Sequence, residues 1–184
     1  MNGKKLLTLT ALLWVLTALS CSAAVFAADS PMGFSLQPLE NLSGDQFDTG
    51  FYSMMIPHHD AAVEASQKIL SATQNPQIKE WAQETIKTYA QQMQQMNQAL
   101  YEESGGWTDQ RLYRTVESAL ASQMKKINSD QTYIKAMIAH NNSTAAMAEL
   151  AKTRTQNQKL LQLSQALVAR QKQNNPRLQE WTAK

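Results

Sequence analysis

Apolar residues recur at helical spacing from residue 43 onward. Over residues 43–71 they fall on one face when each residue is advanced by about 100°, while charged and amide side chains occupy the opposite face. The apolar face comprises Phe47, Phe51, Met54, Met55, His58, Ala62, Ala65 and Ile69. Ser43, followed three residues later by Gln46, predicts a capping box at its start. The pattern therefore predicts a long amphipathic helix with His58 at the centre of its inner face.

Four further helical segments follow. The second helix begins with Asn75 as cap and Pro76 at the first helical position, and ends before Gly105. A connector over 107–128 contains a short helix. Two long helices are predicted over 129–153 and 155–173, the last continuing past Pro176 toward Trp181. No alternating strand pattern is present. The chain is therefore predicted to be all-α.

The helical pattern is repeated after 82 residues, the separation of His58 and His140. The matched positions are Asp48 with Asp130, Phe51 with Tyr133, Met55 with Met137, Ile56 with Ile138, and His58 with His140. The same offset continues into the helix that follows each segment. Each repeat is thus a helical hairpin. Two hairpins that bury their apolar faces together form a four-helix bundle with approximate twofold symmetry.

The two histidine segments differ at one position, since His59 in the first is matched by Asn141 in the second. In a symmetric bundle, His58 and His140 converge on the pseudo-axis. His59 lies about 100° further around its helix, at the edge of the apolar stripe. We therefore expect the two adjacent imidazoles to point in different directions.

The first 27 residues have the pattern of a secretory signal peptide. Lys4 and Lys5 precede an apolar run over 6–19, and small residues lead to an expected cleavage site after Ala27. The run is shorter than the ~20 residues of a membrane-spanning helix. Cys21 offers a lipoprotein alternative, which the residues before it disfavour. The protein is therefore expected to be periplasmic or secreted, with no membrane span after cleavage.

The remaining chain is predicted to comprise an extended N-terminal arm over 28–42, which contains Pro31, Gly33 and Pro38, and one bundle domain over 43–184. The chain of 184 residues has 17 basic and 15 acidic residues, and loss of Lys4 and Lys5 leaves the two signs balanced. We therefore do not expect nucleic acid or an anionic membrane to be a partner of this protein.

The first histidine segment resembles a bacterial family of secreted proteins, the domain-of-unknown-function family numbered 305. The family pattern is met by Asp48, Phe51, Met55, Ile56, His58, His59, Ala62 and Ala65. The resemblance covers about 42–173 and implies a ferritin-like bundle, and some members are associated with copper handling in the cell envelope. The chain departs from the family at Asn141, where a second histidine is usual, and at Tyr89 and Gln92, where glutamine and glutamate are usual.

Imidazole and thioether side chains at helical spacing indicate a metal site. Met55 and Met137 each precede a central histidine by three residues and so share its helix face. We therefore expect His58, His140, Met55 and Met137 to bind a metal, with His59 and Met54 as auxiliary candidates. The alternatives are that His58 and His140 are core histidines satisfied by hydrogen bonds, and that His59 is a solvent-facing residue.

The donor types favour copper. Thioether sulfur is soft and suits Cu(I), and imidazole accepts copper in either oxidation state. Structural zinc sites prefer cysteine, which the mature chain lacks, and no glutamate precedes a histidine by three residues as a di-iron site requires.

The predicted function is therefore an exported copper-binding protein that buffers or carries copper or confers tolerance to it. The alternative is a metal-free helical module that binds another envelope protein. A third alternative is an envelope redox or hydrolytic enzyme of unknown substrate, but no catalytic motif accompanies the histidines, so no enzymatic activity is predicted. The oligomeric state stays open.

Overall fold

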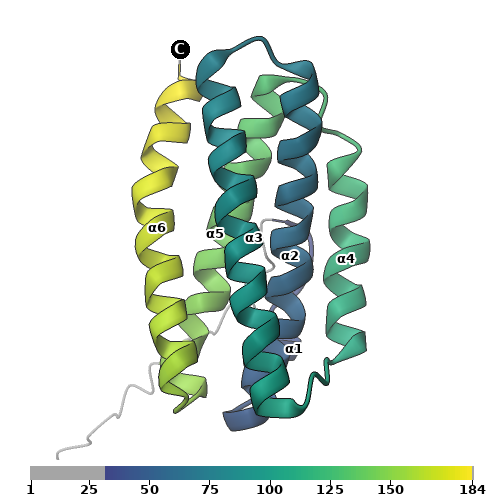
Figure 1. Cartoon of the computed structure of the whole chain (residues 1–184), viewed down its shortest axis with the longest axis vertical. Helices are drawn as coiled ribbons and strands as arrows, with labels where there is room; N and C mark the ends of the chain where they lie inside the picture. Colours follow the sequence, from purple (N-terminus) through teal and green to yellow (C-terminus); the bar gives the residue numbers. More distant parts are fainter. Residues whose placement is uncertain (1–31, 184) are drawn as a thin grey trace, which may run out of the picture.

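The computed structural model describes residues 32–183, which form six helices and no β-strand (Figure 1). The helices are α1 (Gln37–Glu40), α2 (Gly44–Ala72), α3 (Pro76–Ser104), α4 (Gln110–Met124), α5 (Asp130–Arg154) and α6 (Gln158–Thr182). The prediction of an all-α bundle is confirmed. The signal peptide, its cleavage site and Cys21 lie outside the described residues.

Helix α3 begins and ends at the residues that the sequence predicts, and each end is stabilised by the expected cap. The Asn75 side chain accepts hydrogen bonds from two backbone amides of the first turn of α3, and Gly105 closes that helix at a φ of 64°. The prediction of a capping box at Ser43 is wrong, because the Ser43 side chain makes no cap hydrogen bond. Gly44, the residue directly after Ser43, has a φ of 56°, so the backbone leaves regular helical geometry within the turn that the box would span.

Helix α2 is the central element of the fold. It packs against α3, α4 and α5, whereas α5 packs against α2 and α6. In α2, 18 of 29 residues are buried, compared with 10 of 25 in α5, so the first helix of the first repeat is covered on more sides than its counterpart. The contact between α2 and α5 brings together the equivalent helices of the two repeats, as the pseudo-symmetry predicts.

Within the described residues, the segment before α2 is not an extended arm. It contains α1 and places four apolar side chains in the core, namely Met32, Phe34, Leu36 and Leu39. The Gln123 side-chain amide of α4 donates a hydrogen bond of 3.2 Å to the carbonyl of Met32. The hydrophobic effect explains the difference from the prediction. Burying four large apolar side chains lowers the free energy relative to leaving them exposed to water in an extended arm.

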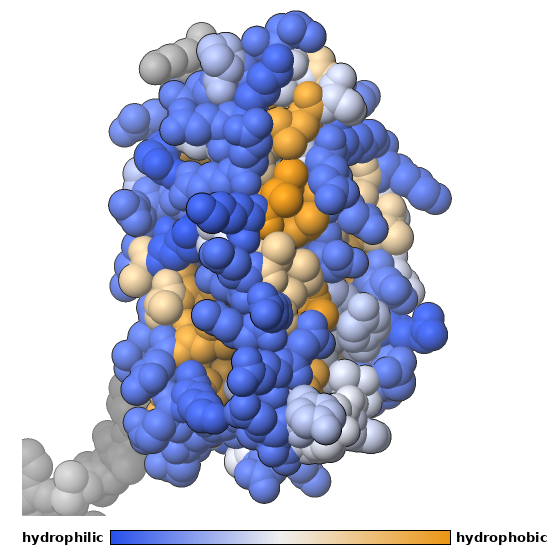
Figure 2. All heavy atoms as spheres, viewed as in Figure 1, coloured by the Kyte–Doolittle hydropathy of each residue, from blue (hydrophilic) through white to orange (hydrophobic). Residues whose placement is uncertain are grey.

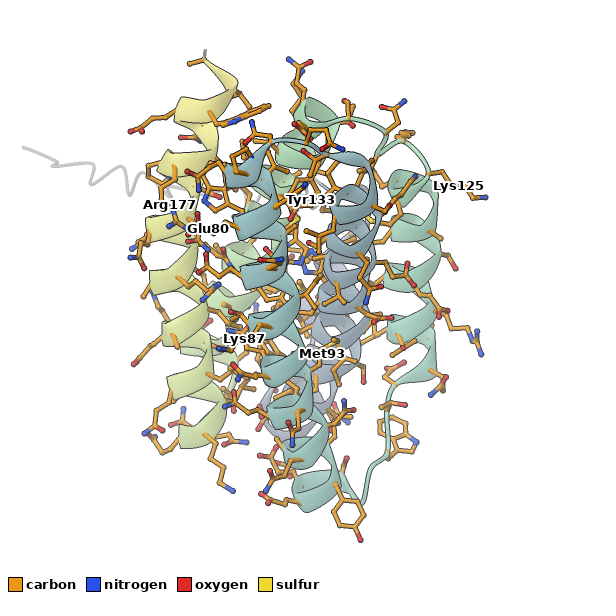
Figure 3. All side chains as sticks on the ribbon, turned by 45° about the horizontal axis from the view of Figure 1, so that its top comes forward. Glu80, Lys87, Met93, Lys125, Tyr133 and Arg177 are labelled. Atoms are coloured by element: carbon orange, nitrogen blue, oxygen red, sulfur yellow. The ribbon has the colours of Figure 1, made fainter. Side chains whose placement is uncertain are left out.

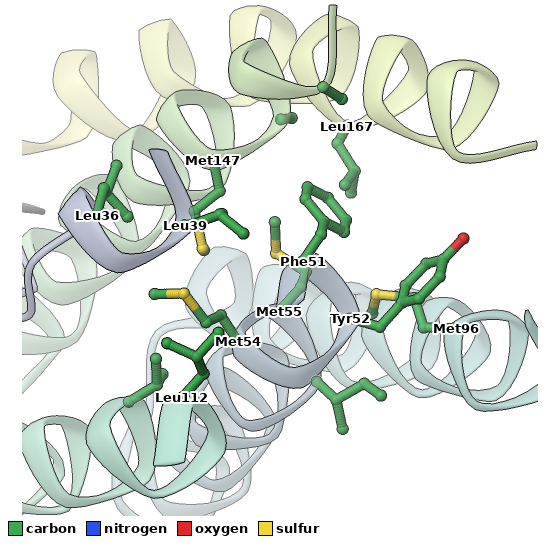
Figure 4. Packing of buried hydrophobic residues seen from close by; sticks show 14 of the residues in the cluster. Leu36, Leu39, Phe51, Tyr52, Met54, Met55, Met96, Leu112, Met147 and Leu167 are labelled. Carbon is green, nitrogen blue, oxygen red and sulfur yellow. The ribbon is translucent and has the colours of Figure 1, made fainter. Parts of the chain in front are cut away.

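The buried apolar residues form two clusters. Met54 and Met55 belong to the first, in which Figure 4 shows them near Leu39 and Met147. Met137 belongs to the second, with Tyr133 of the same helix, which is labelled in Figure 3. The face of the molecule in Figure 2 is mainly hydrophilic, with apolar side chains visible between hydrophilic ridges.

Candidate metal centre

The three histidines of the chain meet between α2 and α5. One ring nitrogen from each of His58, His59 and His140 lies within 4.8 Å of the others. The first two are 0% exposed and His140 is 2% exposed. The prediction that His58 and His140 converge is therefore confirmed, and the alternative of a solvent-facing His59 is wrong. The packing of α3 over α2 buries the flank on which His59 lies.

Hydrogen bonds fix the proton positions on two of the rings. His140 donates from Nε2 to the backbone carbonyl of His58 at 3.2 Å, since a carbonyl oxygen only accepts. His59 places Nε2 at 2.9 Å from the Gln92 side-chain oxygen, which likewise accepts. In a neutral imidazole the other nitrogen, Nδ1, then carries a lone pair. Both rings therefore have the tautomer that keeps a lone pair on Nδ1. Nδ1 of His59 has no hydrogen-bond partner among the described residues, whereas Nδ1 of His140 lies 3.5 Å from the hydroxyl of Tyr89.

The His58 ring makes no comparable hydrogen bond. Both of its ring nitrogens are buried and have no hydrogen-bond partner among the described residues, and the same holds for Nδ1 of His59. Leaving a buried polar group unpaired costs about 1–3 kcal/mol. A structural role as a satisfied core histidine thus fits His140 and does not fit His58.

Aromatic rings enclose the histidines. The His58 ring stacks on His140 with centroids 4.0 Å apart and planes at 17°. Phe34, from the segment before α1, meets His58 edge-on at 5.6 Å, and Tyr89 of α3 stacks on His59 at 4.3 Å. The centre is thus closed by one ring from the N-terminal segment and another from α3.

Burial keeps all three imidazoles neutral at pH 7. Desolvation is the largest influence on each ring and lowers the pKa of His140 to about 4. The pKa values of His58 and His59 are also held well below the ordinary value of 6.5, with His140 adding to the effect on both. Neutral imidazole is the form that binds metals, so no proton has to leave before an ion enters.

Asn141 takes a different role from its counterpart His59. Its side-chain oxygen accepts a hydrogen bond of 3.1 Å from the hydroxyl of Tyr89, and its amide donates to Asn175 at 2.8 Å. Asn175 in turn donates to Asn142, which is exposed. The Tyr89 hydroxyl therefore donates its hydrogen bond to Asn141. The same hydroxyl oxygen lies at the longer distance of 3.5 Å from Nδ1 of His140.

The predicted methionine ligands are all buried, but they belong to different parts of the core. Met54 and Met55 pack in the first apolar cluster, and Met137 packs in the second. The structure thus brings the three histidines together and divides the thioethers between two clusters. A role for Met54, Met55 and Met137 as ligands stays a prediction.

Two residues of α3 that contact His59 are marked in the sequence as departures from the family pattern. Tyr89 and Gln92 lie one helical turn apart and are the two positions of α3 that depart from the family pattern, so the departures mark the face that meets the histidines. Phe34 carried no comparable signal, because nothing in the sequence before α1 indicates which helix it contacts.

Comparison with solved structures gives matches to a protein named CopM. The silver-bound form has 21% sequence identity and a TM-score of 0.61, covering 73% of this chain and 93% of CopM. The Cu(II)-bound form also has 21% identity and a TM-score of 0.61, covering 74% and 95%. The Cu(I)-bound form has 23% identity and a TM-score of 0.59, covering 73% and 94%. These likenesses establish the shared helical fold.

Comparison with curated proteins gave no match. None of the described helices is both long and apolar enough to span a membrane. A family model matches the chain over two segments, 28–100 and 116–184, which correspond to the two repeats. The chain therefore belongs to the family described as Domain of unknown function (DUF305).

Proposed function

We propose that this protein binds a copper ion in the cell envelope and acts there as a buffer, carrier or tolerance factor. The ion is held by His58, His59 and His140, and Met55, Met137 and Met54 are candidates for additional soft ligands. The observation that carries the proposal is the meeting of three neutral, buried imidazoles whose ring nitrogens lie within 4.8 Å of one another.

The hydrogen bonds around the rings support this role. Metal-binding histidines usually donate their second ring N–H to a carbonyl or carboxylate, which fixes the tautomer. His140 and His59 have this arrangement toward the His58 carbonyl and Gln92. The likeness to CopM, whose solved forms contain Cu(I), Cu(II) or silver, points in the same direction.

His58 is the ligand that has to move. A metal bound to an imidazole lies in the plane of the ring, and two stacked rings cannot share an ion in both planes. The His58 ring makes no hydrogen bond that would hold it in the stack. Copper binding therefore turns His58 out of its stack with His140.

A competition titration tests the proposal. The purified protein is titrated with Cu(I) under anaerobic conditions against a chromogenic chelator, alongside the variant H58A/H59A/H140A. We expect the protein to withdraw copper from the chelator and the variant to lose this ability. Equal withdrawal by both proteins, or none by either, contradicts the proposal. As a control, M124L changes a partly buried methionine at the end of α4 and should leave binding unchanged. The backbone carbonyl of Met124 accepts a hydrogen bond from Lys68, which lies about three helical turns along α2 from His58.

The melting temperature gives an independent readout. An ion that binds only the folded state raises the melting temperature of the native protein. A metal-free interaction module, the alternative function, requires the melting temperature to stay constant when copper is added.

A further inference from the structure

We infer that the centre selects monovalent soft cations, Cu(I) and Ag(I), and discriminates against divalent ions such as Cu(II) and Zn(II). This inference rests on the proposed function and specifies the charge of the ion. It follows from the charge balance around the three imidazoles together with their burial, and it does not depend on the methionines.

The donor set carries no negative charge. Among the described residues, the group of side chains placed to hold an ion consists of His58, His59 and His140 and includes no carboxylate. All three rings are neutral, so the full charge of a bound ion stays uncompensated by its ligands.

The surrounding charges do not supply the missing compensation. Arg170 of α6 acts electrostatically on His59. Glu84 pairs with Arg170 at 3.2 Å and with Arg177 at 3.6 Å, so this network holds two positive groups and one negative group. Its net charge is positive, so the network supplies no negative charge to offset that of a bound cation.

Burial turns this balance into selectivity. The three imidazoles are at most 2% exposed, and the rings of Phe34 and Tyr89 lie against them. The cost of transferring an ion from water into such a site grows with the square of its charge, so for a dication it is roughly four times that for a monocation. Two or three neutral nitrogens satisfy Cu(I), whereas Cu(II) prefers a fuller tetragonal set of ligands.

The experiment compares affinities for ions of both charges. The purified protein and the variant H58A/H59A/H140A are titrated with Cu(I), Ag(I), Cu(II) and Zn(II), each against a chelator of known affinity. We expect the histidine-dependent site to bind Cu(I) and Ag(I) at least ~100-fold more tightly than Zn(II) or Cu(II), a difference of about 2.7 kcal/mol. Divalent binding within ~10-fold of Cu(I) binding, lost in the variant, overturns the selectivity but leaves the proposed function standing. Binding of no metal overturns both.

A charge substitution tests the cause. Gln92→Glu places a carboxylate beside His59 without changing side-chain length, and Gln92 is partly exposed, so the new group retains some hydration. We expect Q92E to narrow the gap between Cu(I) and Zn(II) by ~10-fold, the range typical of changes to the partner of a metal-binding histidine. Gln91→Glu adds the same charge at an exposed neighbouring position and should leave the gap unchanged.

Arg170→Gln provides a second route should Q92E fold poorly. It removes one positive charge from the network and leaves Glu84 paired with Arg177. A smaller narrowing in the same direction is expected. Circular dichroism shows whether Q92E and R170Q fold. If both fold and neither changes the ratio of Cu(I) to Zn(II) affinity more than Q91E does, charge balance is not the source of the selectivity and the inference fails.

Discussion

The two hairpins have matching sequence patterns but different surroundings. In the first, α2 is covered by α3, α4 and α5, and its two histidines are both fully buried. In the second, α5 contacts α2 and α6, and its single histidine is followed by Asn141. A repeated pattern thus fixes which residues face inward, whereas position in the bundle decides how many of them can serve as buried donors.

The difference appears most clearly at the matched pair His59 and Asn141. Gln92 of α3 accepts a hydrogen bond from His59, while Asn175 of α6 accepts one from Asn141 and leads on to exposed Asn142. The first hairpin therefore contributes an additional lone pair to the centre. The second hairpin contributes a series of hydrogen-bonded side-chain amides that ends at the protein surface.

Alanine at the two matched positions should give the largest contrast. His59→Ala removes one of three donors, and we expect Cu(I) affinity to fall by ~1,000-fold, about 4 kcal/mol. Asn141→Ala removes no donor and should change Cu(I) affinity by less than ~10-fold, although loss of the Tyr89 hydrogen bond lowers stability. Chelator competition measures both. Equal losses in the two variants would mean that Asn141 is also a ligand.

The metal-free protein should lose stability as the pH falls from about 6.5 to 4. The pKa of His140 is lowered to about 4 by burial, so in this window the unfolded chain takes up protons that the folded chain does not. The free energy of unfolding then decreases by about 3 kcal/mol from His140 alone. His58 and His59 shift in the same direction.

Denaturant unfolding at a series of pH values measures this loss. H58Q/H59Q should flatten the pH dependence more than H140Q does, because it removes two of the three lowered pKa values. A stability that rises on acidification would contradict neutral burial of the cluster.

Truncation of the matched isoleucines compares the packing of α2 and α5. Ile56 is 8% exposed, whereas its counterpart Ile138 is only partly buried. Ile56→Ala should cost about 2–3 kcal/mol and Ile138→Ala about half as much, since a less enclosed site loses fewer contacts. Thermal and denaturant unfolding measure both values. Equal costs would argue that α2 is no more enclosed than α5.

The smallest contrast concerns the amides that support each position. Gln92→Ala should weaken Cu(I) binding by ~10-fold, because His59 loses the partner that fixes its tautomer. Asn175→Ala should leave Cu(I) binding within ~3-fold and lower the free energy of unfolding by about 1 kcal/mol, the worth of an ordinary hydrogen bond. A stronger effect of Asn175→Ala on affinity would place Asn141 closer to the ion than its hydrogen bonds indicate.

Periodicity was sufficient to predict the helices, the repeat and the inward positions of His58 and His140. It failed at His59, because the angle around one helix says nothing about how many neighbours cover that helix. It also failed for Phe34, which reaches the centre through tertiary packing of a segment without a periodic pattern. Both failures arise where contacts between distant parts of the chain, rather than local spacing, determine burial.

The bond from His140 to the His58 carbonyl joins residues 82 positions apart. Such a contact forms only after most of the chain is available, and it closes a long loop at an entropic cost. A chain synthesised from its N-terminus therefore presents two adjacent imidazoles on α2 well before the third can join them. The complete centre therefore requires both hairpins, and the first hairpin alone offers an ion two of the three histidines.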